Sequence, residues 1–129
     1  MIDEKKITLL FNEAKKATTK SYAPYSHFRV GAAVLCSSGK IYSGCNVENS
    51  SYGLTICAER TAIVKAISEG ENSINAIAIY SEDNSDYIYP CGACRQVLQE
   101  FAKECEVICF AKDERYKRFL LPQLFPNPF

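Results

Sequence analysis

Two segments that lie far apart in the chain each place cysteine at the start of a predicted helix. Cys57 stands there in ICAER, and Cys91 and Cys94 stand there in PCGACRQV. The positive end of a helix dipole lowers the pKa of a nearby thiol and so favours the thiolate that binds metal. The C-x-x-C spacing also lets two sulfurs of one turn reach the same ion. The cysteines therefore predict a fold in which two helix starts meet around one metal ion.

Apolar residues recur at two different spacings along the chain. Their helical spacing predicts helices over 7–17, 58–69 and 92–105. Short apolar runs predict strands over 28–35, 40–45, 74–80 and 106–111, with a last short strand or turn at 116–120. Residues 46–56, rich in Asn, Ser and Gly, predict an irregular loop of the kind that carries binding groups. This order predicts the α/β class, as a three-layer α/β/α sandwich around a five-stranded mixed sheet.

Length and charge narrow the class of protein. Residues 1–129 contain no linker and are expected to form a single domain. Lys and Arg total 15 and Asp and Glu total 15, so the net charge of zero favours a free small-molecule substrate over nucleic acid. The polar start and the lack of a long apolar run predict no secretory signal and no membrane span, and hence a cytoplasmic location. Seven cysteines, an odd number, argue against a disulfide framework.

Glu59 lies two residues after Cys57, in the first turn of the same predicted helix. Zinc is the ion that best suits three cysteine ligands in the cytosol. Three protein ligands leave the fourth tetrahedral position for water, which distinguishes a catalytic zinc site from a closed structural one. A carboxylate at Glu59 is placed to exchange protons with groups at that open position. We therefore expect one zinc ion with Glu59 as its acid and base.

The pattern C-x-E followed by P-C-x-x-C is the all-cysteine form of the zinc-deaminase signature. The chain resembles the small cytidine deaminases, which bind zinc through three cysteines and form homotetramers. The resemblance covers nearly the whole length, in the segments SHFRVGAAV, GCNVENSSYGLTICAERTAI, YPCGACRQVLQEF and LLPQLF. It implies the cytidine deaminase-like fold, one Zn²⁺ per subunit on Cys57, Cys91 and Cys94, and a homotetramer whose active sites are shared between subunits.

The resemblance also assigns roles to individual residues. Phe28 corresponds to the aromatic residue that stacks on the pyrimidine, and Asn46 and Glu48 correspond to the pair that hydrogen-bonds a ribose hydroxyl. A ring suits a flat base, and an amide with a carboxylate suits a sugar alcohol. The other implied contacts are the Ala58 backbone and the Glu59 side chain at the base edge, Tyr52 and Phe125 across subunit boundaries, and Arg60 at the ligand sulfurs.

The implied reaction is hydrolytic deamination of free cytidine and deoxycytidine to uridine and deoxyuridine, a step of pyrimidine salvage that releases ammonia. Zinc-bound hydroxide would attack C4 of the pyrimidine, while Glu59 carries protons from the water to N3 and then to the leaving amino group. The enzyme rivals are deaminases of a polynucleotide, a nucleotide or an aminonucleoside antibiotic. The neutral charge argues against the first, and Glu48, which would repel a phosphate, argues against the second.

Several residues also have simpler interpretations. A C-x-x-C alone is as often a redox pair or half of a structural zinc site, and a zinc-stabilised binding module would need a fourth protein ligand. We expect the remaining cysteines and the single histidine to be structural, namely Cys36, Cys45, Cys105, Cys109 and His27. Three places depart from the family pattern: Tyr89 stands where serine is common, Gln123 with Leu124 stands where smaller residues often precede the terminal phenylalanine, and the final PNPF is additional.

Overall fold

The computed structural model describes residues 1–129 and contains one five-stranded sheet with helices on both of its faces. The strands are β1 (Gly31–Cys36), β2 (Ile41–Cys45), β3 (Ile74–Tyr80), β4 (Glu106–Phe110) and β5 (Tyr116–Leu120). The α-helices are α1 (Glu4–Thr18), α2 (Ala58–Ser68), α3 (Gly92–Phe101) and α4 (Leu121–Leu124), and a short 3-10 helix, η1, spans Tyr52–Leu54. None of these helices has the length and apolar character needed to cross a membrane.

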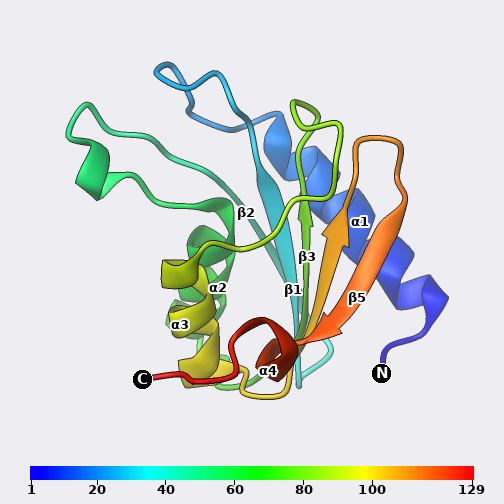
Figure 1. Ribbon diagram of the computed structural model, residues 1–129. Helices are drawn as coiled ribbons and strands as arrows, with labels where there is room; N and C mark the ends of the chain where they lie inside the picture. Colours follow the sequence, from blue (N-terminus) through cyan, green and yellow to red (C-terminus); the bar gives the residue numbers. More distant parts are fainter.

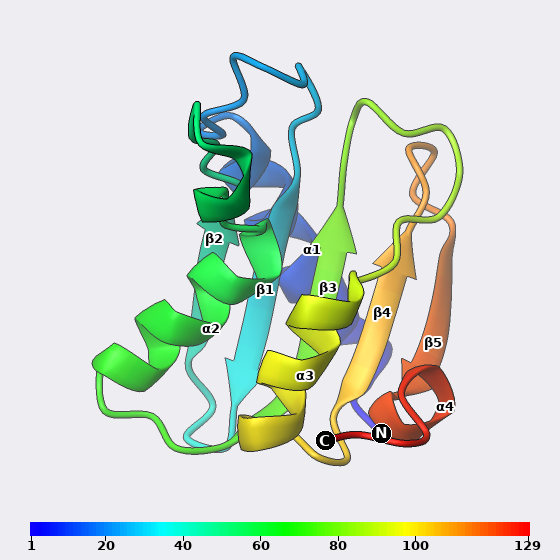
Figure 2. The same cartoon turned by 60° about the vertical axis from the view of Figure 1, so that its left-hand side comes forward.

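The sheet is mixed, and its strand order is β2-β1-β3-β4-β5. β3 and β4 run parallel, with α3 in the connection between them, whereas the other neighbouring strands pair antiparallel. α1 covers one face of the sheet, and α2 and α3 cover the other (Figure 1 and Figure 2). The predicted three-layer sandwich around a five-stranded mixed sheet is confirmed.

Each face of the sheet has its own hydrophobic core. α1 begins where the Asp3 carboxylate accepts a hydrogen bond from the Lys6 N–H at 2.9 Å, and its apolar stripe lies on the sheet. Two glycines allow helices to approach closely. A Cβ atom on Gly31 would lie 1.9 Å from the Ala14 carbonyl oxygen in α1, and one on Gly44 would lie 2.5 Å from a backbone nitrogen in α2. The missing side chains at these strand positions therefore set the spacing between helix and sheet.

Some element boundaries differ from the sequence prediction. The first strand begins at Gly31 and not at Phe28, because side chains from other segments bind the backbone of residues 28–30. The helix predicted over 92–105 ends at Phe101, since Ala102 leaves the helical conformation with φ −151° and starts a turn into β4. η1 and α4 are too short for an apolar period to predict them.

Three loops leave the sheet at one end. In the strand register, Gly31 at the start of β1 pairs with Cys45 at the end of β2 and with Tyr80 at the end of β3. The residues just before Gly31 and just after Cys45 and Tyr80 are therefore brought together, as Figure 1 shows above the sheet. The loops that follow β2 and β3 lead directly into α2 and α3. This end of the sheet consequently holds both helix starts that carry the cysteines.

Candidate metal centre and active site

Three cysteine side chains converge from the starts of two helices. Cys57 is the residue before α2, Cys91 is the residue before α3, and Cys94 lies in the first turn of α3. The Sγ atoms of Cys57 and Cys91 lie 3.8 Å apart, and those of Cys91 and Cys94 lie 3.5 Å apart. All three sulfur atoms lie within 4.8 Å of one another, and all three thiols are free. The two helix starts thus meet through their cysteines.

The spacing of the sulfur atoms fits a tetrahedral metal ion. Two sulfurs bound to zinc at about 2.3 Å in tetrahedral geometry are about 3.8 Å apart, close to the separations seen here. No fourth Cys, His, Asp or Glu joins the group. Cys94 is buried, Cys57 is half-buried and Cys91 is exposed, so the cluster opens on one side. The cluster fits one zinc ion per subunit, with a coordination position left for a ligand from outside the protein.

The electrostatics of the cluster also favour a cation. A hydrogen bond from the Cys94 thiol, with help from the Arg60 guanidinium, lowers the pKa of Cys57 to about 5. The same contact raises the pKa of Cys94, and burial adds to that effect. A Cys57 thiolate thus disfavours a second thiolate at Cys94, and a bound cation would balance the charge of both. A divalent metal ion meets this requirement.

Arg60 brings a positive charge to the edge of the cluster. Its Nη2 atom lies 3.5 Å from Cys57 Sγ and 3.5 Å from the Thr55 carbonyl oxygen. Its Nε atom is buried without a hydrogen-bond partner. The contact with Cys57, helped by Cys94, raises the pKa of Arg60, so the guanidinium stays charged. The predicted role of Arg60 depends on this contact with Cys57 Sγ.

Glu59 is a buried carboxyl group in the first turn of α2, with only 4% of the residue exposed. Burial raises its pKa to about 7, and the charge of Cys57 acts in the same direction. Its own charge helps to raise the pKa of Cys94, so the carboxyl interacts with two of the three cysteines. A carboxyl group with this pKa can both hold and release a proton near neutral pH.

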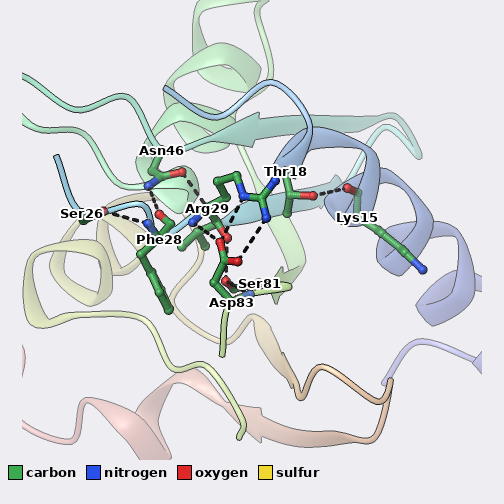
Figure 3. A network of polar contacts seen from close by, with 9 residues as sticks. Lys15, Thr18, Ser26, Phe28, Arg29, Asn46, Ser81 and Asp83 are labelled. Carbon is green, nitrogen blue, oxygen red and sulfur yellow. Dashed lines mark hydrogen bonds and ion pairs between the residues drawn. The ribbon is translucent and has the colours of Figure 1, made fainter. Parts of the chain in front are cut away.

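Phe28 and Asn46 meet at the end of the sheet where the cysteines lie. Phe28 packs half-buried against the core on the face that α2 and α3 cover. Asn46 is buried, and its side chain bridges the segment that contains Phe28 (Figure 3). Asn46 Oδ1 accepts a hydrogen bond from the Val30 N–H at 3.0 Å, and Nδ2 donates to the Phe28 carbonyl oxygen at 2.7 Å. Asn46 therefore has a structural task beside its predicted contact with ribose.

Glu48 organises the turn ahead of Phe28. Its Oε1 atom accepts hydrogen bonds from the N–H groups of Tyr25 and Ser26 at 3.0 and 3.1 Å, and the Ser26 hydroxyl donates to Oε2. These hydrogen bonds, led by that of the Ser26 hydroxyl, lower the pKa of Glu48 and keep it a carboxylate. A pocket of about 420 Å³ lies beside it, lined by Tyr25, Ser26, Glu48, Asn49, Tyr52 and Thr55.

Tyr52 and Phe125, predicted to act across subunit boundaries, differ in exposure. Tyr52 in η1 is 76% exposed, and its ring centroid lies 6.2 Å from that of Tyr25. Phe125 follows α4 and packs half-buried against the core of its own chain. Ala58, the first residue of α2, is fully buried, and the predicted contact of its backbone with the base stays a prediction.

The other cysteines and the histidine stay outside the cluster. Three of these cysteines are buried, and Cys45 is half-buried at the end of β2. The buried ones are Cys36, Cys105 and Cys109. His27 is exposed, has a left-handed φ of 58° and joins no group of metal-binding side chains. The closed four-cysteine site that a binding module requires is therefore not formed.

Two further features lie outside this cluster. Tyr89, which departs from the family pattern, is half exposed, and its ring centroid lies 6.0 Å from that of Phe119 in β5. A hollow of about 730 Å³ lies between the N-terminus, the end of α3 and the start of β4. It contains none of the predicted site residues.

Sequence reasoning missed two arginines near the site. Arg95 donates from Nε to the Pro90 carbonyl oxygen at 2.8 Å and from Nη1 to the Leu124 carbonyl oxygen at 2.6 Å. Arg95 thus links the segment before the C-x-x-C pair to α4. Nothing in the sequence predicts this link, because arginine is common on the exposed face of a helix. Arg29 is a charged residue inside the apolar run that predicted the first strand, which is a weak sign of a special role. In the structure it forms an ion pair with Asp83.

This arrangement coincides with a match to a protein family. The model of the cytidine and deoxycytidylate deaminase zinc-binding region matches residues 4–111. The chain belongs to the cytidine and deoxycytidylate deaminase family. The resemblance that the two cysteine motifs indicated is thereby confirmed.

Individual members of the deaminase family are similar over most of the chain. A probable cytidine deaminase from Dictyostelium discoideum is 45% identical over 128 residues, which is 99% of this chain and 86% of that protein. A cytidine deaminase from Sporosarcina psychrophila is 54% identical over 92 residues, 71% of this chain and 67% of that protein. The crystal structure of cytidine deaminase from Burkholderia pseudomallei superposes with a TM-score of 0.90 at 43% identity, covering 95% of this chain and 98% of that one.

Proposed function

We propose that this member of the deaminase family catalyses the hydrolytic deamination of free cytidine and deoxycytidine to uridine and deoxyuridine, with release of ammonia. The observation that carries the proposal is the meeting of three cysteines with the buried Glu59 at the start of α2. The names of the relatives from Dictyostelium discoideum and Burkholderia pseudomallei support the choice of cytidine. Free nucleosides as substrates would place the reaction in pyrimidine salvage.

The chemistry is divided between the metal and Glu59. Cys57, Cys91 and Cys94 would hold zinc, which when bound activates a water molecule as a nucleophile. Glu59 takes a proton from the attacking water and passes it to N3 of the pyrimidine, which makes C4 more electrophilic. Once the water oxygen has bonded to C4, the same carboxyl takes the remaining proton of that oxygen and delivers it to the amino group, so that the C4–N bond breaks and ammonia leaves. A pKa of about 7, maintained by burial, suits both halves of this exchange. Arg60 balances part of the negative charge of the cysteine ligands.

The nucleoside would be held by the loops at the same end of the sheet. Phe28 stacks on the pyrimidine, and the Ala58 backbone with Glu59 reads its polar edge. The Glu48 carboxylate accepts a hydrogen bond from the ribose 3′-hydroxyl. The Nδ2 atom of Asn46 carries two hydrogens, and the Phe28 carbonyl uses one of them, so the second is free for ribose.

We further propose that the active sites are shared between subunits of a homotetramer. Exposed apolar side chains lie together on the loops beside the site, where the backbone of Val47 bridges to both Tyr22 and Ile56. The set comprises Tyr22, Tyr25, Val47, Tyr52, Leu54 and Ile56. Exposed apolar side chains concentrated on neighbouring loops favour a protein interface at this end of the molecule. Tyr52 and Phe125 would then complete the site of a neighbouring subunit. Light scattering should give a mass four times the 14.4 kDa of the chain.

The N-terminal segment is tied to the sheet and the C-terminal segment to α3, which supports the proposal that residues 1–129 act as a single catalytic domain. The Ile2 N–H donates to Glu106 Oε1 at 3.1 Å, and Arg118 donates to the Ile2 carbonyl oxygen at 2.7 Å. At the other end, Arg95 holds the Leu124 carbonyl oxygen. Each terminal segment is therefore held by an element of the same domain.

The test is turnover by the purified, zinc-loaded protein. Cytidine, deoxycytidine and deoxycytidine monophosphate are supplied separately, and the ultraviolet change and the released ammonia are followed. We expect both nucleosides to be deaminated and the monophosphate to be a poor substrate, because the ionised Glu48 repels a phosphate. Turnover of the monophosphate alone would replace the substrate assignment, and turnover of none of the three would contradict the proposal.

Glu59→Gln separates an enzyme from a protein in which zinc is only structural. Glutamine has nearly the same shape but cannot move protons, so turnover should fall by about 10²- to 10⁴-fold while zinc and fold are retained. Cys91→Ser should lose the metal, whereas Cys45→Ser, which alters a half-buried cysteine outside the cluster, should keep it. Full turnover in Glu59→Gln would contradict the assigned role.

A further inference from the structure

Arg29 and Asp83 join two loops at the end of the sheet where the cysteines lie, and we call this contact the Arg29–Asp83 clasp. The Nε and Nη2 atoms of Arg29 donate to the two carboxylate oxygens of Asp83, each at 3.1 Å (Figure 3). The backbone N–H of Arg29 also donates to Asp83, at 2.9 Å. Ser81 completes the clasp, because its hydroxyl donates to the Arg29 carbonyl oxygen at 2.6 Å and accepts from the Asp83 N–H at 3.1 Å.

Residues 28–30 form no regular strand, yet their backbone groups are hydrogen-bonded from two sides. From the loop after β2, the Asn46 side chain binds the Phe28 carbonyl oxygen and the Val30 N–H. From the loop after β3, Ser81 and Asp83 bind the carbonyl oxygen and the N–H of Arg29. Side chains therefore replace the sheet in holding this segment, and removal of one leaves a backbone group without its partner.

The clasp acts on the side of the segment away from the Phe28 ring. In Figure 3 the ring of Phe28 and the guanidinium of Arg29 point in different directions, as neighbouring side chains of extended backbone do. The ring packs toward the core under α2 and α3, where the metal-binding cysteines lie. Asp83 is 26% exposed in its side chain, so the clasp is only partly open to solvent. It can therefore fix the backbone of Phe28 without touching a bound base.

We propose that Arg29 and Asp83 are positioning residues that fix the Phe28 ring for stacking on the pyrimidine. The inference rests on the proposed function, in which Phe28 is the stacking ring. Asp83 belongs to the loop that continues into Cys91, so one segment positions both the ring and two of the metal ligands. The loop between β3 and α3 thereby controls the affinity for the nucleoside as well as the place of the metal.

Asp83→Ala tests the proposal directly. Stacking contributes to the binding of substrate and transition state alike, so its partial loss should raise KM for cytidine about 5- to 10-fold with kcat within about twofold. Calorimetry with the product uridine should show affinity reduced by the same factor. Hydrogen exchange at the Arg29 amide should become faster, because its acceptor is lost.

Two milder variants and a matched control refine the test. Asp83→Asn keeps an oxygen that can accept from the Arg29 N–H, and Arg29→Ala keeps the Asp83 carboxylate as that acceptor. For both variants, KM for cytidine and the affinity for uridine should therefore lie between the values of the parent and of Asp83→Ala. The control is Asp113→Ala. Arg115 donates to Asp113 from Nε at 2.7 Å and from its backbone N–H at 3.3 Å, but this pair lies in the turn between β4 and β5. Its loss should leave KM and uridine binding unchanged.

The outcomes separate this proposal from the proposed function. If the parent enzyme deaminates cytidine and Asp83→Ala behaves like Asp113→Ala in KM and uridine affinity, the clasp is only a structural contact and the inference is wrong. A fall in kcat without a change in KM would also overturn it. Parent protein that neither deaminates cytidine nor binds uridine would overturn both. Should Asp83→Ala fail to fold, the KM values of Asp83→Asn and Arg29→Ala decide the matter.

Discussion

Arg60 is the cationic side chain that contacts the cysteine cluster, and its effect should be chemical more than structural. Three thiolates on a divalent ion carry a net negative charge, and hydrogen bonds to the sulfurs reduce the electron density that they donate. Arg60→Ala should lower kcat/KM by about 10- to 100-fold and change the melting temperature little. Arg60→Lys keeps the charge but not the fork of donors, so its activity should be intermediate. A variant that loses stability but keeps its activity would contradict this role.

Asn46 illustrates how one side chain serves both the fold and the ligand. Its amide is already hydrogen-bonded to the backbone on either side of Arg29, and the Asn46 side chain is buried. An aspartate there would present an oxygen to the Phe28 carbonyl in place of a donor. The residue type at this position is therefore constrained by the segment that it holds, independently of any contact with ribose.

At the scale of an element, Gly44 sets the distance between β2 and α2. A Cβ atom there would lie 2.5 Å from the Ala62 nitrogen and 2.9 Å from the Thr61 carbonyl carbon, so the helix backbone must move. Gly44→Ala should lower the free energy of unfolding by about 1–3 kcal/mol. Because Cys57 and Glu59 lie at the start of α2, the shift should also weaken zinc binding.

Gly53→Ala is the matched control for this prediction, since a Cβ atom on Gly53 would meet nothing within 4 Å. Urea unfolding of the two variants and the parent measures the difference. Equal stability of Gly44→Ala and Gly53→Ala would show that α2 has room to move without cost.

Short apolar runs predicted four of the strands and left the fifth as a short strand or turn, and helical spacing predicted the three long helices, because these elements bury apolar side chains in the two cores. The cysteine triad was predicted for a similar reason, since helix starts and C-x-x-C spacing are local features. The start of β1 was predicted wrongly. Side chains of Asn46, Ser81 and Asp83, all distant in the sequence, hydrogen-bond the backbone before Gly31 in place of a neighbouring strand. The Arg29–Asp83 clasp could not be predicted from the sequence for the same reason, since its two residues lie 54 positions apart.

For the whole molecule, Glu106 links the N-terminus to the sheet and should make stability depend on pH. Burial alone would raise its pKa, but hydrogen bonds from Arg118 and the Ile2 N–H together hold the pKa below its ordinary value. Because the folded pKa is the lower one, the stabilisation is present above the unfolded pKa of about 4.3 and is lost as the pH falls through the folded value.

Glu106→Gln tests this link through the pH dependence of unfolding. At pH 7 the variant should be less stable than the parent by about 1–3 kcal/mol, and the difference should shrink toward zero in acid, where the parent is protonated as well. Glu104→Gln, at an exposed neighbouring position, should follow the parent throughout. Urea titrations at several pH values provide the measurement, and a difference that stays constant with pH would contradict the linkage.

The proposed sharing of active sites between subunits predicts a result that needs two variants together. If Phe125 completes a neighbour's site, Phe125→Ala and Glu59→Gln disable the same site from different chains. Each variant alone should be nearly inactive. When the two are unfolded together and refolded as mixed oligomers, a site works where a chain with native Glu59 adjoins one with native Phe125. Random assembly yields about a quarter of such sites, so about a quarter of the parent activity should return. If Phe125 serves only its own chain, against whose core it packs, mixing restores nothing.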